Sequence, residues 1–322
     1  MKHEIALMSP IHATGMAELD ENYIVHRVWE ASDPKAFMAS IASNIEVAVT
    51  AGLRGMKAWE MDALPRLKLL ASFGVGYDGI DVAAARQRGI IVTNTPDVLN
   101  ECVADTTWTL ILSTVRRTAF NDRYVRAGRW LSGPAPLSDK VWGENLGIIG
   151  LGRIGRAIAR RAQGFGMQVG YHGRTAQHDL AFQYFADPVE LARWAKILVV
   201  ACPGGPETRN IVNEQVLQAL GRDSYLINIS RGSTVDEAAL IRALTDGTIG
   251  GAGLDVFVDE PKVPEVLCQL DNVVLQPHVG SGTHATRAAM ASMVTANVAA
   301  WFAGKPLPSP IPEHGIASPH QV

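Results

Sequence analysis

The stretch Leu146-Gly-Ile-Ile-Gly-Leu-Gly-Arg-Ile-Gly155 decides how the surrounding chain folds. Its Gly150-x-Gly152-x-x-Gly155 pattern directly follows an apolar run, and a helical pattern continues over residues 156–165. Glycines at these positions permit a tight turn and a close backbone approach, so a pyrophosphate can lie at the helix N-terminus. The alternative is that the glycines only pack a helix against a sheet. Their position between strand and helix favours a dinucleotide-binding unit.

Short apolar runs alternate with helical patterns on both sides of this unit. The apolar runs after the unit are at 168–171, 197–201, 225–229, 253–257 and 273–276. The apolar runs before it are at 5–8, 23–29, 45–50, 67–73 and 90–93. This alternation is typical of α/β folds with parallel sheets. The helical pattern over 100–117 is apolar on nearly every side, which predicts burial between domains or between subunits.

Composition excludes several classes of protein. A length of 322 residues predicts two domains at about 150 residues each. Hydrophobic residues make up 47% of the chain and charged residues 19%, which excludes a disordered protein. The net charge of −3 offers no electrostatic footprint for a nucleic acid or an anionic membrane. No apolar run reaches the roughly 18 residues that a membrane helix needs.

Three widely spaced cysteines, Cys102, Cys202 and Cys268, form no C-x-x-C pair. We therefore expect neither a disulfide framework nor a metal site, and a reducing, cytoplasmic location.

The second strand of the unit predicts which cofactor binds. An NAD site would carry Asp or Glu about 20 residues after the glycines. Here the strand ends Val169-Gly-Tyr-His-Gly-Arg-Thr175, without a carboxylate. Arg174, with Thr175 beside it, suits the 2′-phosphate of NADP, because a guanidinium can pair with two phosphate oxygens. The alternatives are that Arg174 is merely a solvated surface residue, and that His172 contacts the phosphate.

Three polar residues lie just after predicted strands, where α/β sheets bind their ligands. Arg231 follows Ile227-Asn-Ile-Ser230, Glu260 follows Leu254-Asp-Val-Phe-Val-Asp259, and His278 follows Val274-Leu-Gln-Pro277. Each alone could be structural. The three together, beside a dinucleotide site, favour a catalytic group.

Over essentially its whole length the chain resembles the D-isomer-specific 2-hydroxyacid dehydrogenases, and within them the glyoxylate/hydroxypyruvate and hydroxyphenylpyruvate reductases. The resemblance is densest in long motifs: Gly74-Val-Gly-Tyr-Asp78, Val92-Thr-Asn-Thr-Pro-Asp97, 147–155, Asn228-Ile-Ser-Arg-Gly232, Gly251-Ala-Gly-Leu-Asp-Val-Phe257 and Pro277-His-Val-Gly-Ser281.

The resemblance implies that His278 is the acid/base, Glu260 its partner and Arg231 the substrate anchor. The chemistry supports these roles, because reduction of a 2-oxo acid needs a proton on the carbonyl oxygen beside the hydride from the cofactor. An imidazolium is a natural donor near neutral pH, and a bonded carboxylate favours its charged form. The backbone N–H groups of Val75 and Gly76 would bind the substrate carboxylate.

The resemblance also implies further cofactor contacts. Asp255 should meet the nicotinamide carboxamide, although Cys202 could equally be a packing residue at the end of its strand. The implied cofactor-binding set is Thr107, Gly150, Gly152, Arg153, Ile154, Gly155, His172, Arg174, Thr175, Cys202, Ile229, Arg231, Asp255, His278 and Gly280.

We therefore expect two doubly wound parallel-sheet domains with a cleft between them. Residues 1–97 and 289–322 would form a flavodoxin-like substrate domain, and residues 98–288 a Rossmann cofactor domain. The expected activity is reduction of a glyoxylate- or hydroxypyruvate-type 2-oxo acid to the D-2-hydroxy acid, with NADP(H) preferred and NAD(H) as the second cofactor. A homodimer is expected, because the family forms one and because the apolar helix over 100–117 needs a partner surface. The alternatives are a reductase for a bulkier hydroxyphenylpyruvate- or 2-ketogluconate-type acid, and a non-catalytic dinucleotide sensor resembling the family's corepressors.

Overall fold

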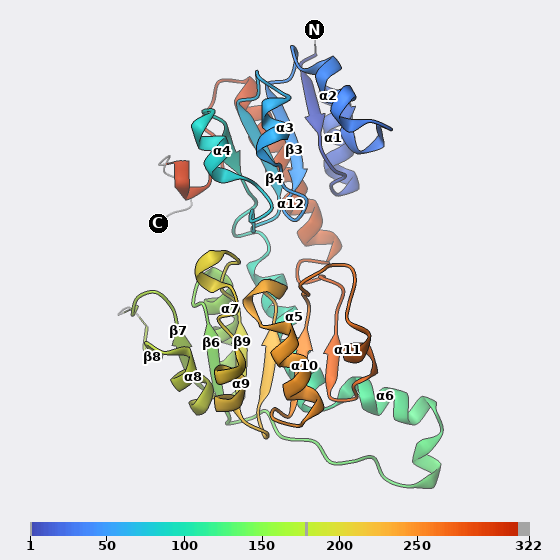
Figure 1. The fold of residues 1–322 in the computed structure, drawn as a ribbon, viewed down its shortest axis with the longest axis vertical. Coiled ribbons are helices and arrows are strands. Elements are labelled where there is room, and N and C mark those ends of the chain that lie inside the picture. Colours follow the sequence, from blue (N-terminus) through green and yellow to red (C-terminus); the bar gives the residue numbers. More distant parts are fainter. Residues whose placement is uncertain (1, 178–179, 315–322) are drawn as a thin grey trace. The chain divides into compact units, whose positions relative to one another are not determined.

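The chain forms two compact units in the computed structural model, which describes residues 2–177 and 180–314 (Figure 1). Unit 1 comprises Met1–Leu99 and Thr283–Val322, and unit 2 comprises Asn100–Gly282. The sequence predicted that the second segment of the substrate domain starts at residue 289, six residues after Thr283. Unit 1 resumes earlier because helix α12 (His284–Phe302) is continuous and packs on β4 (Leu69–Phe73) of this unit. Residues 315–322 of that predicted domain lie outside the described part.

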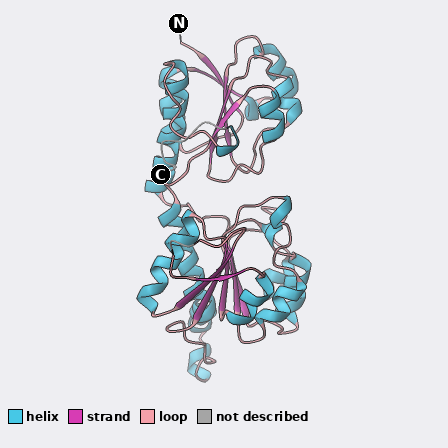
Figure 2. Ribbon diagram, turned by 90° about the vertical axis from the view of Figure 1, so that its left-hand side faces the viewer, coloured by secondary structure: helices cyan, strands magenta, loops and turns pink. Residues whose placement is uncertain are grey.

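Unit 1 is a five-stranded parallel sheet in the order β2-β1-β3-β4-β5, the flavodoxin-like order. Its other strands are β1 (Glu4–Leu7), β2 (Ile24–Arg27), β3 (Val47–Ala51) and β5 (Ile91–Thr93). Its other helices are α1 (Ala13–Asn22), α2 (Pro34–Ile41), α3 (Ala58–Asp62) and α4 (Val82–Gln87). Helices flank both faces of the sheet, so its inner strands are nearly continuously apolar (Figure 2).

Unit 2 is a seven-stranded parallel sheet in the order β12-β11-β10-β9-β6-β7-β8. The strand order reverses between β6 and β9, and such switch points are where doubly wound sheets bind ligands. The strands are β6 (Asn145–Ile149), β7 (Gln168–His172), β8 (Gln183–Phe185), β9 (Ile197–Val200), β10 (Tyr225–Asn228), β11 (Gly251–Leu254) and β12 (Val273–Leu275). The sequence did not predict β8, because three partly exposed edge residues carry no hydrophobic period.

The helices of unit 2 are α5 (Asn100–Val115), α6 (Thr118–Arg126), α7 (Arg153–Ala162), α8 (Pro188–Trp194), α9 (Glu214–Leu220), α10 (Glu237–Thr245) and α11 (Glu265–Gln269). The prediction that α5 is apolar on nearly every side was wrong. Glu101, Asp105 and Thr109 form an exposed stripe at helical spacing, and the buried side packs on α7, β10 and β11 within unit 2. Burial of α5 therefore needs no partner subunit.

Among the described residues, no helix is both long and apolar enough to cross a membrane.

Candidate functional site

The glycine loop after β6 is shaped for a close ligand. Gly150 has φ of +96°, and a Cβ there would lie 2.6 Å from the backbone of Cys202. A Cβ on Gly155 would lie 2.3 Å from the carbonyl oxygen of Gly150. Gly152 is the N-cap residue of α7, so no side chain caps the helix, and nothing lies within 4 Å of where its Cβ would be. The first N–H groups of α7, including those of Arg153 and Ile154, lack intrahelical acceptors. The loop therefore fits the pyrophosphate of a dinucleotide.

The end of β7 separates the two candidates for a 2′-phosphate contact. His172 Nδ1 lies 3.0 Å from the carbonyl oxygen of Phe185 in β8, so Nδ1 carries the proton that it donates. In a neutral ring Nε2 is then only an acceptor, which is unsuited to a phosphate. Arg174 and Thr175 are exposed on the following loop. The geometry favours Arg174 over His172.

His278 and Glu260 lie together at the carboxyl edge of the sheet. His278 Nδ1 is 2.7 Å from Glu260 Oε2, and both side chains are partly exposed. The backbone N–H of Phe257 donates to the other carboxylate oxygen of Glu260 at 3.0 Å. Burial alone would raise the pKa of Glu260, but the hydrogen bonds from His278 and Phe257 and the charge of Arg231 outweigh it and hold the pKa below its usual range. The pair leaves Nε2 of His278 as the ring atom available to a substrate.

The loop that carries His278 is held by Asp255. His278 has φ of +52°, a left-handed conformation that is uncommon outside glycine. The carboxylate of Asp255 accepts hydrogen bonds from the N–H of Val279 at 2.7 Å and of Gly280 at 2.8 Å, and its carbonyl accepts from His278 N–H at 2.9 Å. Burial raises the pKa of Asp255 and outweighs the hydrogen bonds from Val279 and Gly280 and the charge of His278, which lower it.

This function of Asp255 was missed from the sequence, which assigned it only a cofactor contact. The signal was there, since an Asp that ends one strand lies beside the loop that ends the next strand of a parallel sheet. Thr106 Oγ1 also donates to the Gly280 carbonyl, at 3.2 Å. The loop is therefore tied both to β11 and to α5.

Arg231 follows β10 in a tightly bonded turn. Its carbonyl accepts from Asn228 Nδ2 at 3.0 Å and from Thr234 Oγ1 at 2.7 Å, and its guanidinium donates to the Ser230 carbonyl at 2.7 Å. A Cβ on Gly204 would lie 2.8 Å from the Arg231 side chain. The turn thus fixes the backbone of Arg231. Because Gly204 has no side chain, it leaves room for the aliphatic part of the Arg231 side chain.

The remaining predicted cofactor residues form part of the interior of unit 2. Cys202 and Ile229 are buried at strand ends, and burial raises the pKa of the Cys202 thiol to about 11. The Cys202 thiol is therefore neutral at neutral pH. Thr107 is fully buried, and its hydroxyl donates to the Val103 carbonyl at 2.7 Å.

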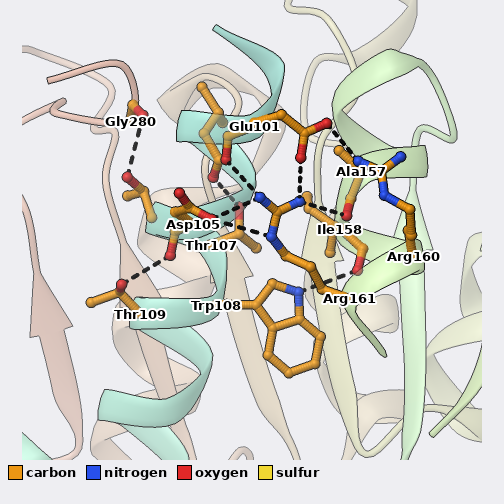
Figure 3. A network of polar contacts seen from close by, with 12 residues as sticks. Glu101, Asp105, Thr107, Trp108, Thr109, Ala157, Ile158, Arg160, Arg161 and Gly280 are labelled. Atoms are coloured by element: carbon orange, nitrogen blue, oxygen red, sulfur yellow. Dashed lines mark hydrogen bonds and ion pairs between the residues drawn. The ribbon is translucent and has the colours of Figure 1, made fainter. Parts of the chain in front are cut away.

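A polar network joins α5 to α7, the helix that the glycine loop opens (Figure 3). Arg161 donates to Glu101 and to Asp105, each at 2.7 Å, and Trp108 Nε1 donates to the Ile158 carbonyl at 3.2 Å. Trp108 also stacks on Phe165 with ring centroids 4.4 Å apart. Because Thr106 of α5 also bonds to Gly280, α5 contacts both α7 and the loop that carries His278.

The predicted substrate turn lies in unit 1, directly after β4. Gly74 has φ of +150° and its carbonyl accepts from Thr95 N–H at 3.0 Å, while Asn94 Nδ2 donates to the Val75 carbonyl at 2.9 Å. A Cβ on Gly52 would lie 2.3 Å from the carbonyl oxygen of Gly76. The carbonyls of Val75 and Gly76 are thus packed against their own unit.

Residues 108–280 match a protein family described as "D-isomer specific 2-hydroxyacid dehydrogenase, NAD binding domain". The chain is 47% identical to a glyoxylate/hydroxypyruvate reductase A of Arabidopsis thaliana and 46% identical to a hydroxyphenylpyruvate reductase of Plectranthus scutellarioides. Each match covers 95% of this chain and 98% of the relative. A solved NADPH-dependent glyoxylate/hydroxypyruvate reductase of Sinorhizobium meliloti, in complex with NADP and malonate, is 42% identical with a TM-score of 0.90, over 97% of this chain and 98% of that one.

Proposed function

The chain belongs to the D-isomer-specific 2-hydroxyacid dehydrogenase family, and we propose that it reduces a small 2-oxo acid of the glyoxylate or hydroxypyruvate type to the D-2-hydroxy acid with NADPH. The observation that carries this proposal is the 2.7 Å hydrogen bond between His278 and Glu260, at the carboxyl edge of a dinucleotide-binding sheet. The His278–Glu260 pair therefore lies at the edge of the sheet where such folds bind their ligands.

His278 delivers the proton. Glu260 accepts from Nδ1 and so orients the ring, while protonated Nε2 donates to the carbonyl oxygen as charge develops on it. A bound nicotinamide dinucleotide supplies the hydride. Asp255 keeps the loop of His278 in its left-handed conformation, so the ring does not have to be reorganised in each turnover.

Arg231 anchors the substrate. A planar guanidinium binds a carboxylate in two places and polarises an adjacent carbonyl. From unit 1 we assign the N–H groups of Val75 and Gly76 as further donors to the substrate carboxylate, because the carbonyls of this turn are packed inward.

The cofactor preference rests on charge. Arg174 is an exposed cation on the loop after β7, and the end of that strand carries no carboxylate to hold a ribose or repel a phosphate. The Sinorhizobium meliloti relative is an NADPH-dependent enzyme, which agrees with this assignment. NADH is the weaker cofactor in this proposal.

A homodimer belongs to the same proposal, on different grounds from those of the sequence prediction. Trp130, Leu131 and Leu137 are exposed by 68%, 95% and 96% of their surface on the segment between α6 and β6. Large apolar side chains that stay exposed within one segment favour an interface there.

The test is NADPH oxidation by the purified enzyme with glyoxylate, hydroxypyruvate, 4-hydroxyphenylpyruvate and 2-ketogluconate. We expect the highest kcat/KM with one of the two small acids. A higher kcat/KM with 4-hydroxyphenylpyruvate would favour the second candidate, to which the 46% identity with the Plectranthus enzyme points equally well. Absence of turnover with all four acids would contradict the proposal.

A further inference from the structure

The last described segment of the chain runs beside the substrate turn. Residues 309–313, here called the C-terminal strap, pair antiparallel to edge strand β5 through a bridge between Thr93 and Pro310. The N–H of Ile311 donates to the Val92 carbonyl at 3.0 Å, and the side chain of Ile311 is fully buried. The strap is therefore built into unit 1.

One end of the strap reaches the substrate turn through Asn94. Ser309 is fully buried; its hydroxyl donates to the Asn94 carbonyl at 2.7 Å and accepts from Asn297 of α12 at 2.9 Å. Asn94 in turn donates from Nδ2 to the Val75 carbonyl at 2.9 Å. A continuous chain of hydrogen bonds thus connects α12, the strap and the turn.

The other end reaches the turn directly. The hydroxyl of Tyr77 donates to Glu313 Oε1 at 2.8 Å, although the two residues lie 236 positions apart in the sequence. Burial, the hydrogen bond and the charge of Glu313 all raise the pKa of Tyr77, so its hydroxyl stays a donor throughout the neutral range. Tyr77 directly follows Gly76, whose N–H we assign to the substrate.

We propose that Glu313 and Tyr77 are positioning residues, through which the C-terminal strap holds the substrate turn in the geometry that binds the substrate carboxylate. This inference rests on the proposed function, because it takes the N–H groups of Val75 and Gly76 as the carboxylate site. Two attachments, one on each side of Gly76, restrict a stretch that contains two glycines and no regular structure. Ordering the turn in advance lowers the entropy cost of binding a small anion.

The sign of the effect separates positioning from simple electrostatics. Glu313 is a carboxylate beside a site for an anion, so its charge alone disfavours the substrate. Removing that charge should lower the KM for the oxo acid if electrostatics dominate. If the hydrogen bond to Tyr77 dominates, removing it should raise the KM.

The experiment compares E313A, E313Q and Y77F, and the E313A/Y77F double variant, with the wild-type full chain. We expect E313A and Y77F each to raise the KM for hydroxypyruvate by about two- to tenfold, the worth of one net hydrogen bond. The kcat and the KM for NADPH should stay within about twofold, and the double variant should be no worse than either single one. E313Q should restore most of the affinity, because the glutamine oxygen still accepts from Tyr77.

D20A is the matched control. Asp20 is also an exposed carboxylate that accepts a hydrogen bond, from Arg27 at the end of β2, and β2 is the opposite edge strand of the same sheet. Its KM values should equal those of the wild type. An unchanged or lower KM in E313A, or an equal loss in E313Q, would overturn the inference.

Hydrogen exchange of the free enzyme provides a readout that does not need turnover. The amides of residues 73–80 should exchange faster in E313A and Y77F than in the wild type and D20A. If the wild type reduced no 2-oxo acid, the proposed function would fail while exchange still decided the positioning of the turn. Unchanged exchange in both variants would overturn the inference, whatever the substrate.

Discussion

His278 and Glu260 share a 2.7 Å hydrogen bond between Nδ1 and Oε2, although they lie 18 positions apart in the sequence, with α11 and strand β12 between them. β11 and β12 are parallel neighbours, so the segments that follow them emerge at the same edge of the sheet. The Glu follows one strand and the His the next. The pairing is therefore a consequence of strand order, and Asp255 completes it by holding the loop of His278.

Arg231→Lys should lower kcat/KM for the oxo acid strongly, because a single ammonium cannot match a planar carboxylate in two places. The loss should appear in kcat as well as in KM, since the guanidinium also polarises the carbonyl in the transition state. The KM for NADPH should remain near the wild-type value. Steady-state kinetics with each substrate varied in turn would check this, and a loss confined to the cofactor would show that Arg231 is not the substrate anchor.

Arg174→Ala should raise the KM for NADPH and leave that for NADH nearly unchanged. A charge-assisted hydrogen bond is worth about 1.5–3 kcal/mol, or roughly ten- to a hundredfold, and screening at an exposed site favours the lower figure. Arg193→Ala, at another exposed arginine of unit 2, is the control. Equal losses with both cofactors, or equal use of them by the wild type, would argue against the assignment.

Gly155→Ala should impair both folding and cofactor binding. The added Cβ would lie 2.3 Å from the Gly150 carbonyl oxygen, so the glycine loop must shift, at a cost of roughly 1–3 kcal/mol for overpacking. Gly164→Ala adds the same atom where nothing lies within 4 Å. Thermal unfolding and NADPH titration should show a lower Tm and weaker binding in the first variant only. A Gly155 variant that binds NADPH normally would show that the loop does not contact the cofactor.

The pKa of Glu260 predicts how the stability of the fold depends on pH. A carboxyl whose pKa is lower in the folded than in the unfolded state stabilises the fold above its unfolded pKa and loses that contribution as the pH falls through the folded value. Glu260 is such a group. Urea unfolding of the wild type and Glu260→Gln should show a stability gap at pH 7 that narrows as the pH falls below about 4. A gap independent of pH would mean that the charge of Glu260 contributes nothing.

The sequence predicted the parts of the fold and site that depend on local pattern. The glycine spacing at Gly150, Gly152 and Gly155 and the apolar runs indicated the two parallel sheets, because buried parallel strands are nearly continuously apolar. The same logic failed for β8, whose three edge residues carry no period. It also overestimated the apolar character of α5, whose exposed stripe was hidden in a mostly apolar composition.

Contacts between distant residues were beyond the reach of pattern alone. The cofactor contact of Asp255 was implied by the resemblance. Strand order places this residue beside the loop that carries His278, but only the structure shows that its carboxylate accepts from the amides of Val279 and Gly280. The bond between Tyr77 and Glu313 depends on the path of a C-terminal strap that has no periodic signal of its own.

The central claim is that His278 delivers the proton to a 2-oxo acid, and the most direct measurement is the kcat of His278→Ala for hydroxypyruvate with NADPH, together with its dissociation constant for NADPH. We predict a fall in kcat of roughly 10²–10⁴-fold, the usual worth of a positioned acid, with the NADPH dissociation constant within about threefold of the wild-type value. Near wild-type turnover in a variant that still binds NADPH would contradict the account.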